Sequence, residues 1–254
     1  MNTLSVIIIT RNEQSNLDAC LSSVCEVADE IVIVDSFSTD DTLSIAKSYR
    51  AVISSPPDWL GFGTQKNRAL DLATKDWVLS IDADERLTKE LQNEIKAVLS
   101  NPLGDCYAIP RRSYYCGRLI NYSGWNPDFV TRLFKRGTAR FSDHLVHEKL
   151  VITGSKQFLK QPMLHFSFID FSQVLQKVDR YSTDSAQQAF ALHKTSSVFN
   201  AVFHGAWAFF RTYFLKFGFL DGSHGLALAI SNAEGSYYRY LKLWLLNQRV
   251  DRAN

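Results

Sequence analysis

The feature that most constrains the fold is an apolar run at residues 77–81, which ends abruptly in the carboxylates Asp82, Asp84 and Glu85. A run of this kind predicts a buried strand that delivers two acidic side chains to the edge of a sheet, where open α/β folds bind ligands. Two carboxylates one residue apart suit Mg²⁺ or Mn²⁺, which prefer oxygen ligands and complete their shell with water and phosphate oxygens. The alternative is a solvated acidic turn that caps a helix beginning near Leu87.

The first eighty residues alternate strand and helix patterns. Strands are predicted at residues 4–9, 30–34 and 51–54, and helical patterns at 17–24, 43–49 and 65–73. This alternation predicts an α/β fold with a mostly parallel sheet flanked by helices. The polar loops at residues 10–13, 35–41 and 82–84 all follow strands, so we expect them to meet in one crevice at the carboxyl edge.

The phosphate-binding glycine motifs of other nucleotide-binding folds are absent from the sequence. No G-x-G-x-x-G follows the first strand, and no G-x-x-x-x-G-K-[ST] occurs. Phosphate charge would therefore be met by a metal and by side chains. Asp35 could accept hydrogen bonds from a ribose or a base, whereas Asp40 and Asp41 could equally cap the following helix.

Composition excludes several classes of protein. The chain is 46% hydrophobic and 21% charged, as expected of a globular protein, and its net charge of +2 gives no reason to expect a nucleic-acid partner. The four cysteines have neither paired C-x-x-C spacing nor a histidine pattern typical of zinc, which favours a reduced, cytoplasmic protein. Residues 4–9 are too short for a signal-peptide core, so we expect no export.

Four segments in order, residues 5–13, 33–42, 63–70 and 81–85, resemble the family 2 glycosyltransferases of the GT-A fold, a Rossmann-like nucleotide-diphospho-sugar transferase fold. With the rest of the chain, the similarity extends to lipopolysaccharide core glucosyltransferases that act on inner-core heptose. The resemblance implies a UDP-sugar donor, with UDP-glucose as the expected one, and inversion at the anomeric carbon. It assigns the metal to Asp84, with Asp82 facing metal and ribose, and the rest of the donor site to Thr10, Asn12, Glu13, Asp35, Gln65, Lys66 and Asn67.

Aromatic and arginine residues gather after residue 103. Aromatic faces suit sugar rings and arginines suit phosphates, so this segment is predicted to form the acceptor side, although aromatics are also ordinary core residues. The candidates are Arg111, Tyr115, Trp125 and Arg132.

Inverting transfer needs a base beside the acceptor hydroxyl. The resemblance points to an acidic residue after the aromatic segment, and Glu148 is the first candidate and Asp143 the second. The Glu-Asp pair that is commoner in the family is absent here. His147 or His165 could complete the metal shell, as a later histidine does in some GT-A enzymes.

The second half turns helical beyond Ser172. Residues 198–220 are densely apolar but contain His204, Arg211 and Lys216, and a second helix is predicted at 226–246. A central arginine costs roughly 2.5–3.5 kcal/mol in a membrane span, so burial in the membrane interface is favoured over a span. A helical subdomain that packs on itself or forms a dimer is the alternative.

These observations predict a catalytic domain at 1–170, with a nucleotide-sugar half at 1–100 and an acceptor half at 101–170, followed by a helical extension at 171–254. We expect the protein at the inner face of the cytoplasmic membrane, acting on a lipid-linked saccharide. Two other functions are considered: a haloacid-dehalogenase-like phosphohydrolase, whose D-x-D however lies on the first strand, and a catalytically silent membrane-associated scaffold.

Overall fold

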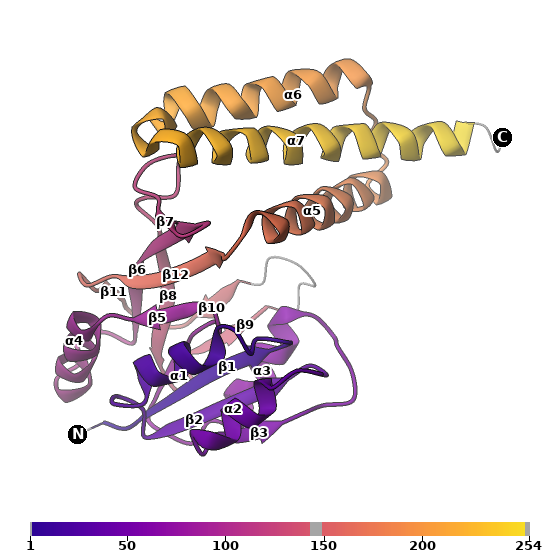
Figure 1. The fold of residues 1–254 in the computed structure, drawn as a ribbon. Coiled ribbons are helices and arrows are strands. Elements are labelled where there is room, and N and C mark those ends of the chain that lie inside the picture. The colour runs from indigo at the N-terminus through magenta and orange to yellow at the C-terminus, as the bar shows by residue number, and fades with distance from the viewer. Residues whose placement is uncertain (1, 143–148, 252–254) are drawn as a thin grey trace. The chain divides into compact units, whose positions relative to one another are not determined.

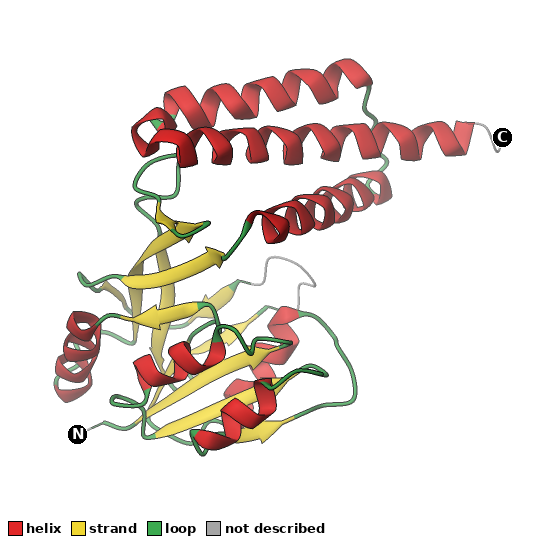
Figure 2. Cartoon of the chain, viewed as in Figure 1, coloured by secondary structure: helices red, strands yellow, loops and turns green. Residues whose placement is uncertain are grey.

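The computed structural model describes residues 2–142 and 149–251, with the backbone alone for residues 249–251. The chain divides into two compact units, which are described separately. Unit 1 comprises residues 1–111 and 128–165, and unit 2 comprises residues 112–127 and 166–254. The division differs from a single boundary at residue 170, because segment 112–127 groups with the C-terminal helices. Figure 2 shows the helices and strands of each unit.

Unit 1 begins with the predicted βα alternation (Figure 1). Strands β1, β2 and β4 pair in parallel, with β3 parallel to β2. The helices lie between these strands in the chain. The elements are β1 (Leu4–Thr10), α1 (Leu17–Val24), β2 (Glu30–Asp35), α2 (Thr42–Ser48), β3 (Val52–Ser54), α3 (Phe62–Leu72), β4 (Trp77–Ser80), β5 (Glu85–Leu87) and α4 (Lys89–Ser100).

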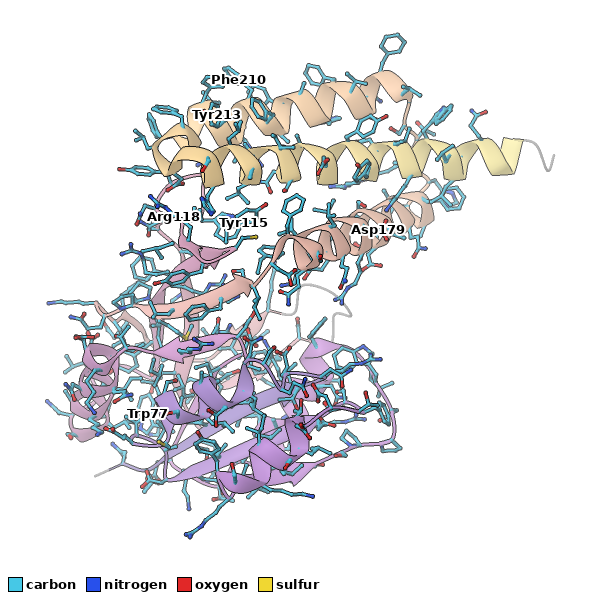
Figure 3. All side chains as sticks on the ribbon, in the orientation of Figure 1. Trp77, Tyr115, Arg118, Asp179, Phe210 and Tyr213 are labelled. Carbon is cyan, nitrogen blue, oxygen red and sulfur yellow. The ribbon has the colours of Figure 1, made fainter. Side chains whose placement is uncertain are left out.

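Both faces of the parallel strands are buried, with alternate residues serving each face. Leu4, Val6 and Ile8 join the core formed with α1 and α4, whereas Ile7 joins the opposite core formed with α3. Trp77, labelled in Figure 3, lies in the first of these cores. The continuous β-branched run of β1 is thereby explained, because no position of the strand faces solvent freely.

The sheet is mixed beyond β4. Among the described residues, ten strands form one sheet, in which β8 pairs antiparallel with both β4 and β6, and β12 pairs antiparallel with β5. Strands β9 and β10 form a separate antiparallel pair. The later strands are β6 (Cys106–Tyr115), β7 (Arg118–Leu119), β8 (Phe129–Lys135), β9 (Ala139–Phe141), β10 (Leu150–Ile152), β11 (Lys156–Phe158) and β12 (Met163–Phe168).

The segment directly after Asp84 is a strand, whereas a helix was predicted to begin near Leu87. Glu85–Leu87 forms strand β5, and helix α4 begins at Lys89. The side chain of Thr88 caps this helix by accepting a hydrogen bond from the backbone N–H of Leu91, 3.2 Å away. Asp82 and Asp84 therefore do not cap α4, and the alternative that the acidic motif is a helix-capping turn is wrong.

Unit 2 contains a helical bundle. It is formed by α5 (Phe171–Ala191), α6 (Val198–Phe210), the π-helical turn η1 (Arg211–Leu215), the 3₁₀ turn η2 (Gly218–Asp221) and α7 (Gly222–Asp251). Within this unit α7 contacts both α5 and α6, and Figure 1 shows α5 and α6 on different sides of α7. The apolar segment at residues 198–220 is thus helical as far as η1, and the turn η2 separates it from α7. No described helix is both long enough and apolar enough to cross a membrane.

Candidate active site

The loops after β1 and β2 are joined at their first residues. Thr10 and Asp35 are register partners at the carboxyl ends of the two strands, and Thr10 donates from Oγ1 to Asp35 Oδ1 at 2.8 Å. Asp35 also accepts from the backbone N–H of Ser38 at 3.0 Å. The buried carboxylate of Asp35 therefore organises the loop that follows its own strand.

The loop after β1 is held against the loop after β2. The backbone N–H of Asn12 donates to Ser38 Oγ at 2.8 Å, and Asn12 Oδ1 accepts from the backbone N–H of Thr39 at 2.8 Å. Asn12 has φ +55°, a conformation that asparagine tolerates better than most residues. The side chain of Glu13 accepts from Asn16 Nδ2 at 3.0 Å, and the backbone N–H of Glu13 donates to Thr42 Oγ1 at 2.8 Å. The predicted convergence of the first two loops is confirmed.

Asp82, at the end of β4, is held by two cations from other elements. Lys66 Nζ on α3 lies 3.0 Å from Asp82 Oδ1, and Arg132 Nη2 on β8 lies 2.5 Å from Asp82 Oδ2. Burial alone would raise the pKa of Asp82, but Arg132 and Lys66 outweigh it and hold that pKa well below its ordinary value. Both carboxylate oxygens are thus engaged, which fixes the direction of the acidic loop.

Glu85 lies at the centre of this network with no exposed surface. Its Oε1 accepts from Arg132 Nη2 at 2.6 Å and from Arg111 Nη1 at 3.3 Å, while its Oε2 accepts from the backbone N–H of Asp82 at 3.0 Å. Arg111 also pairs with Asp128 at 2.8 Å. The same carboxylate therefore positions two arginines and the start of the acidic loop.

Arg132 keeps unused hydrogen-bonding capacity within this buried network. Its Nε is buried and has no hydrogen-bond partner among the described residues. The two carboxylates raise the pKa of Arg132 against the effect of burial, so the side chain stays cationic. A buried N–H without an acceptor costs about 1–3 kcal/mol, which an oxygen of an anionic ligand could recover.

Asp84 faces a histidine rather than a lysine or an arginine. Its Oδ2 lies 3.3 Å from His165 Nε2 on β12, and both side chains are partly exposed. His165 is the register partner of Glu85 in the β5–β12 pair, which explains how residues 80 positions apart come together. The described residues contain no group of three or more histidine, cysteine or acidic side chains arranged for a metal. The pair can nevertheless supply a carboxylate oxygen from Asp84, the kind of ligand that Mg²⁺ and Mn²⁺ prefer, and an imidazole nitrogen from His165.

Helix α3 carries three further predicted donor-site residues, all buried. Gln65 Nε2 donates to Ser36 Oγ at 3.1 Å, which connects α3 to the loop after β2. Asn67 exchanges two hydrogen bonds of 2.9 Å with the backbone of Phe141, so its amide joins α3 to β9. Lys66, between them, points to Asp82.

The predicted acceptor residues fall into different surroundings. Arg111 and Arg132 belong to the charged network of unit 1. In unit 2, Tyr115 is only 1% exposed and shares its hydroxyl with Ser231 Oγ at 3.0 Å, with the ring edge-on to Trp125. The expectation of an exposed ring therefore does not hold for Tyr115, because it packs in the core with Ile120 and Val174. Trp125 is partly buried against that core. The base candidates Glu148 and Asp143, and the possible ligand His147, lie outside the described residues.

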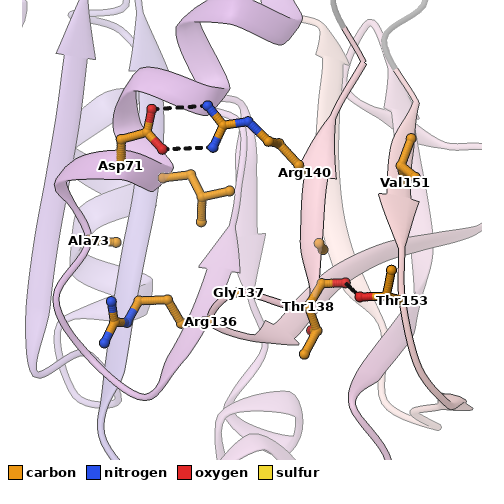
Figure 4. A pocket seen from close by; sticks show the side chains of 10 residues that line it. Asp71, Ala73, Arg136, Gly137, Thr138, Arg140, Val151 and Thr153 are labelled. Atoms are coloured by element: carbon orange, nitrogen blue, oxygen red, sulfur yellow. Dashed lines mark hydrogen bonds and ion pairs between the residues drawn. The ribbon is translucent and has the colours of Figure 1, made fainter.

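A cavity elsewhere in unit 1 has a different character. It has a volume of about 390 Å³ and is lined by residues of α3 and of the β8–β9 and β10 segments (Figure 4). Arg140 and Asp71 pair across it at 2.8 and 3.2 Å. It lies beside Arg136, whose backbone pairs with Asp76 at the amino end of β4, so it is at the opposite end of that strand from Asp82.

Three residues of the site were not among the sequence-based candidates. Glu85 was noticed only as part of the acidic run, although its burial makes it central. Ser38 bonds both Asp35 and Asn12. Phe37 follows Asp35 by two residues in the loop after β2, has φ +62° and is 52% exposed, an uncommon conformation for a bulky residue. No sequence pattern reveals a positive φ at a phenylalanine.

Parallel β-strands with two interlocked polar loops, and an acidic loop at the end of β4, are the arrangement of a GT-A-type fold. The family model for Glycosyl transferase family 2 matches residues 5–165, and the chain belongs to that family. Family membership favours a glycosyltransferase over the phosphohydrolase and the silent scaffold.

Relatives extend over almost the whole chain. An uncharacterized glycosyltransferase of Rickettsia prowazekii is 32% identical over 96% of this chain and 87% of its own length. The lipopolysaccharide core biosynthesis glycosyltransferase LpsC of Rhizobium meliloti is 33% identical over 93% of each chain. Among solved structures, Staphylococcus aureus TarS 1–349 in complex with UDP-GlcNAc shares the fold, with a TM-score of 0.52, 16% identity and coverage of 97% of this chain and 92% of that one.

Proposed function

We propose that this protein is an inverting, metal-dependent glycosyltransferase that moves a sugar, glucose from UDP-glucose in the first instance, onto inner-core heptose of lipopolysaccharide. The observation that carries the donor site is the charged network around Asp82 and Glu85, with Lys66, Arg111 and Arg132 beside the loops after β1 and β2. In the proposed site, these cations would offset the negative charge of the donor's diphosphate. The similarity to LpsC supports the lipopolysaccharide core as acceptor.

The nucleoside end of the donor is assigned to the interlocked loops. Asn12 and Glu13 lie at the surface of these loops, and the buried pair of Thr10 and Asp35, together with the hydrogen bonds between the loops, holds that surface in one shape. Gln65 supports the same loops from α3. Loops held in one shape in this way reduce the entropy that is lost when a nucleotide binds.

The metal is assigned to Asp84, with His165 as the second protein ligand. Their mutual approach of 3.3 Å and partial exposure fit a pair that a cation would bridge. Asp82 is assigned to orientation of the loop, because Lys66 and Arg132 already occupy both of its oxygens. A bound Mg²⁺ or Mn²⁺ would supply stabilisation of the negative charge on the departing diphosphate. Lys66 and the Nε of Arg132 supply charge and a hydrogen-bond donor to the same end.

Attack requires a base on the acceptor hydroxyl. We assign it to Glu148, with Asp143 as the second choice. Arg111 and Arg132 of unit 1 are assigned to the acceptor side, and Tyr115 and Trp125 of unit 2 stay acceptor candidates from the sequence. A lipid-linked acceptor would place the reaction at the inner face of the cytoplasmic membrane. The oxygen of the acceptor then displaces UDP with inversion, while the base takes the proton.

The donor site is tested by thermal shift with UDP and Mn²⁺ together. Ligand that binds the native state raises the melting temperature by mass action. The wild-type protein and Asp71→Asn, which alters only the exposed pair with Arg140, should both respond. Asp84→Asn should lose the contribution of Mn²⁺. An unchanged melting temperature of the wild type at saturating UDP and Mn²⁺ would refute the donor site.

The transferred sugar and the base are tested by activity. A panel of UDP-sugars with a heptose-terminated core saccharide should show preferential transfer from UDP-glucose. Glu148→Gln should keep the thermal shift with UDP and Mn²⁺ but lose transfer. Retained transfer would move the role of base to Asp143 or another residue.

A further inference from the structure

Helix α6 turns its small residues toward its partner helix in unit 2. Its buried positions are Ala201, Gly205 and Ala208, followed by Thr212 in η1. A Cβ placed on Gly205 would lie 3.1 Å from the Cβ of Tyr237 and 3.3 Å from the carbonyl oxygen of Ala233, both on α7. The backbones of α6 and α7 therefore approach closely, and little large apolar surface of α6 is buried between them.

The large apolar residues of α6 and the turns after it are exposed instead. Phe199 is 88% and Phe203 67% exposed, and each of the others keeps about half of its surface open. Figure 3 labels Phe210 along this segment. We call these residues the outer face of α6: Phe199, Val202, Phe203, Trp207, Phe210, Phe214, Leu215, Phe217, Phe219 and Leu220.

This distribution is the reverse of that in a helical hairpin stabilised in water. The hydrophobic effect favours burial of phenylalanine and tryptophan before alanine, since burial of one such side chain contributes about 1.5–3 kcal/mol. Small residues between helices and large ones facing outward are typical of helices whose surroundings are apolar. An exposed apolar patch of this extent marks an interaction surface.

The charge of the segment selects the partner. Residues 198–220 contain no aspartate or glutamate, whereas they carry Arg211 and Lys216, both exposed. Aromatic side chains with basic groups among them suit the boundary between acyl chains and anionic headgroups. A protein partner of equal apolarity would not need this one-signed charge.

The segment fits a position in the plane of a membrane. No described helix qualifies as a membrane span, and the break at η1 and η2, where Phe217 has φ +54°, ends the helix after 18 residues counted from Val198 to Leu215. We propose that the outer face of α6 docks on a phospholipid bilayer containing anionic lipids, with its aromatic side chains inserted at the headgroup boundary and Arg211 and Lys216 at the phosphates. This deepens the membrane location in the proposed function, but it does not depend on the donor or the reaction.

The test is cosedimentation of the full chain with two kinds of vesicle. One is phosphatidylcholine alone, and the other is phosphatidylcholine with roughly 30% phosphatidylglycerol, an anionic lipid that attracts basic segments. Wild-type protein should bind the anionic vesicles at least tenfold more tightly, and added salt should weaken that binding. The double variant Phe203→Ser/Trp207→Ser should lose binding to both vesicles by roughly tenfold or more. Arg211→Glu/Lys216→Glu should lose the preference for anionic lipid.

Leu103→Ser is the matched control, because Leu103 is an exposed apolar residue of unit 1 outside the outer face of α6. It should bind vesicles as the wild type does. All variants should keep the wild-type circular dichroism spectrum and the thermal shift with UDP and Mn²⁺, which separates this proposal from the donor site. Wild-type protein that stays in the supernatant, or a double variant that binds normally, would overturn the proposal. The proposal would also be overturned if the wild type were a dimer, the double variant a monomer, and neither protein bound vesicles.

Discussion

Arg132 contacts Glu85 at 2.6 Å although Glu85 has no exposed surface and Arg132 is almost fully buried. Through the same guanidinium, Arg132 also reaches the first carboxylate of the acidic motif. A buried cation shared between two carboxylates is costly to build and costly to break, because each partner left alone keeps an uncompensated charge. This contact explains how the end of β4 is held in one arrangement, and it yields the first prediction.

Arg132→Met should destabilise the fold by about 2–4 kcal/mol, below the full cost of breaking a buried pair because Asp82 is partly exposed. Chemical denaturation at neutral pH measures the change. Arg140→Met is the control, since the Arg140–Asp71 pair is exposed and should cost less than about 1 kcal/mol. Equal effects of the two substitutions would contradict a central role for Arg132.

The cost of Arg132→Met should depend on pH. In the wild type, the depressed pKa of Asp82 contributes stability that is present above the unfolded pKa, near about 4, and is lost only as pH falls through the lower folded pKa. Removal of Arg132 raises the pKa of Asp82 in the folded protein. The difference in unfolding free energy between the two proteins should therefore be largest near neutral pH and should narrow only as the pH falls below about 4. A gap that widens on acidification would show that Asp82 is not the group involved.

Lys66→Met should weaken binding of UDP-sugar by about 10- to 100-fold, the size expected for loss of a hydrogen bond to a charged group. Loss of Lys66 also leaves Asp82 with Arg132 as its remaining cation among the described partners. Isothermal titration with UDP and Mn²⁺ measures the affinity. Lys89→Met, which breaks an exposed pair with Glu26, should bind as the wild type does.

Asp84→Asn and His165→Ala should each lower the affinity for Mn²⁺ in the presence of UDP, by about tenfold or more for the charged ligand. If both residues bind one ion, the double variant should lose less than the sum of the two single effects, as for any two groups that act together. Calorimetric titration of the wild type, the two single variants and the double variant with Mn²⁺ provides the double-mutant cycle. Fully additive effects would place His165 outside the metal site.

Gly205→Ala should destabilise the hairpin of α6 and α7 by about 1–3 kcal/mol, because the added methyl group meets Tyr237 and backbone at less than ordinary contact distance. Gly235→Ala on α7 is the matched control. A Cβ there would meet Val178 at 3.9 Å, so the substitution should instead stabilise the helix by about 0.5–1 kcal/mol. Thermal unfolding of the two variants should thus shift in opposite directions, and parallel shifts would refute close packing at Gly205.

The sequence by itself determined the βα alternation of residues 4–81, because β-branched runs buried on both faces and polar loops at their ends have few other solutions. It also identified Asp35, Asp82 and Asp84, since carboxylates that directly follow such runs must lie at the carboxyl edge. Tertiary structure decided which side chains meet there. His165 reaches Asp84 through strand pairing across 81 residues, and Arg132 reaches Glu85 across 47. Local sequence patterns do not encode such distant register. It likewise decided that Tyr115 is buried and that the aromatic residues of α6 are exposed, because close backbone packing at Gly205 excludes large side chains from the helix interface.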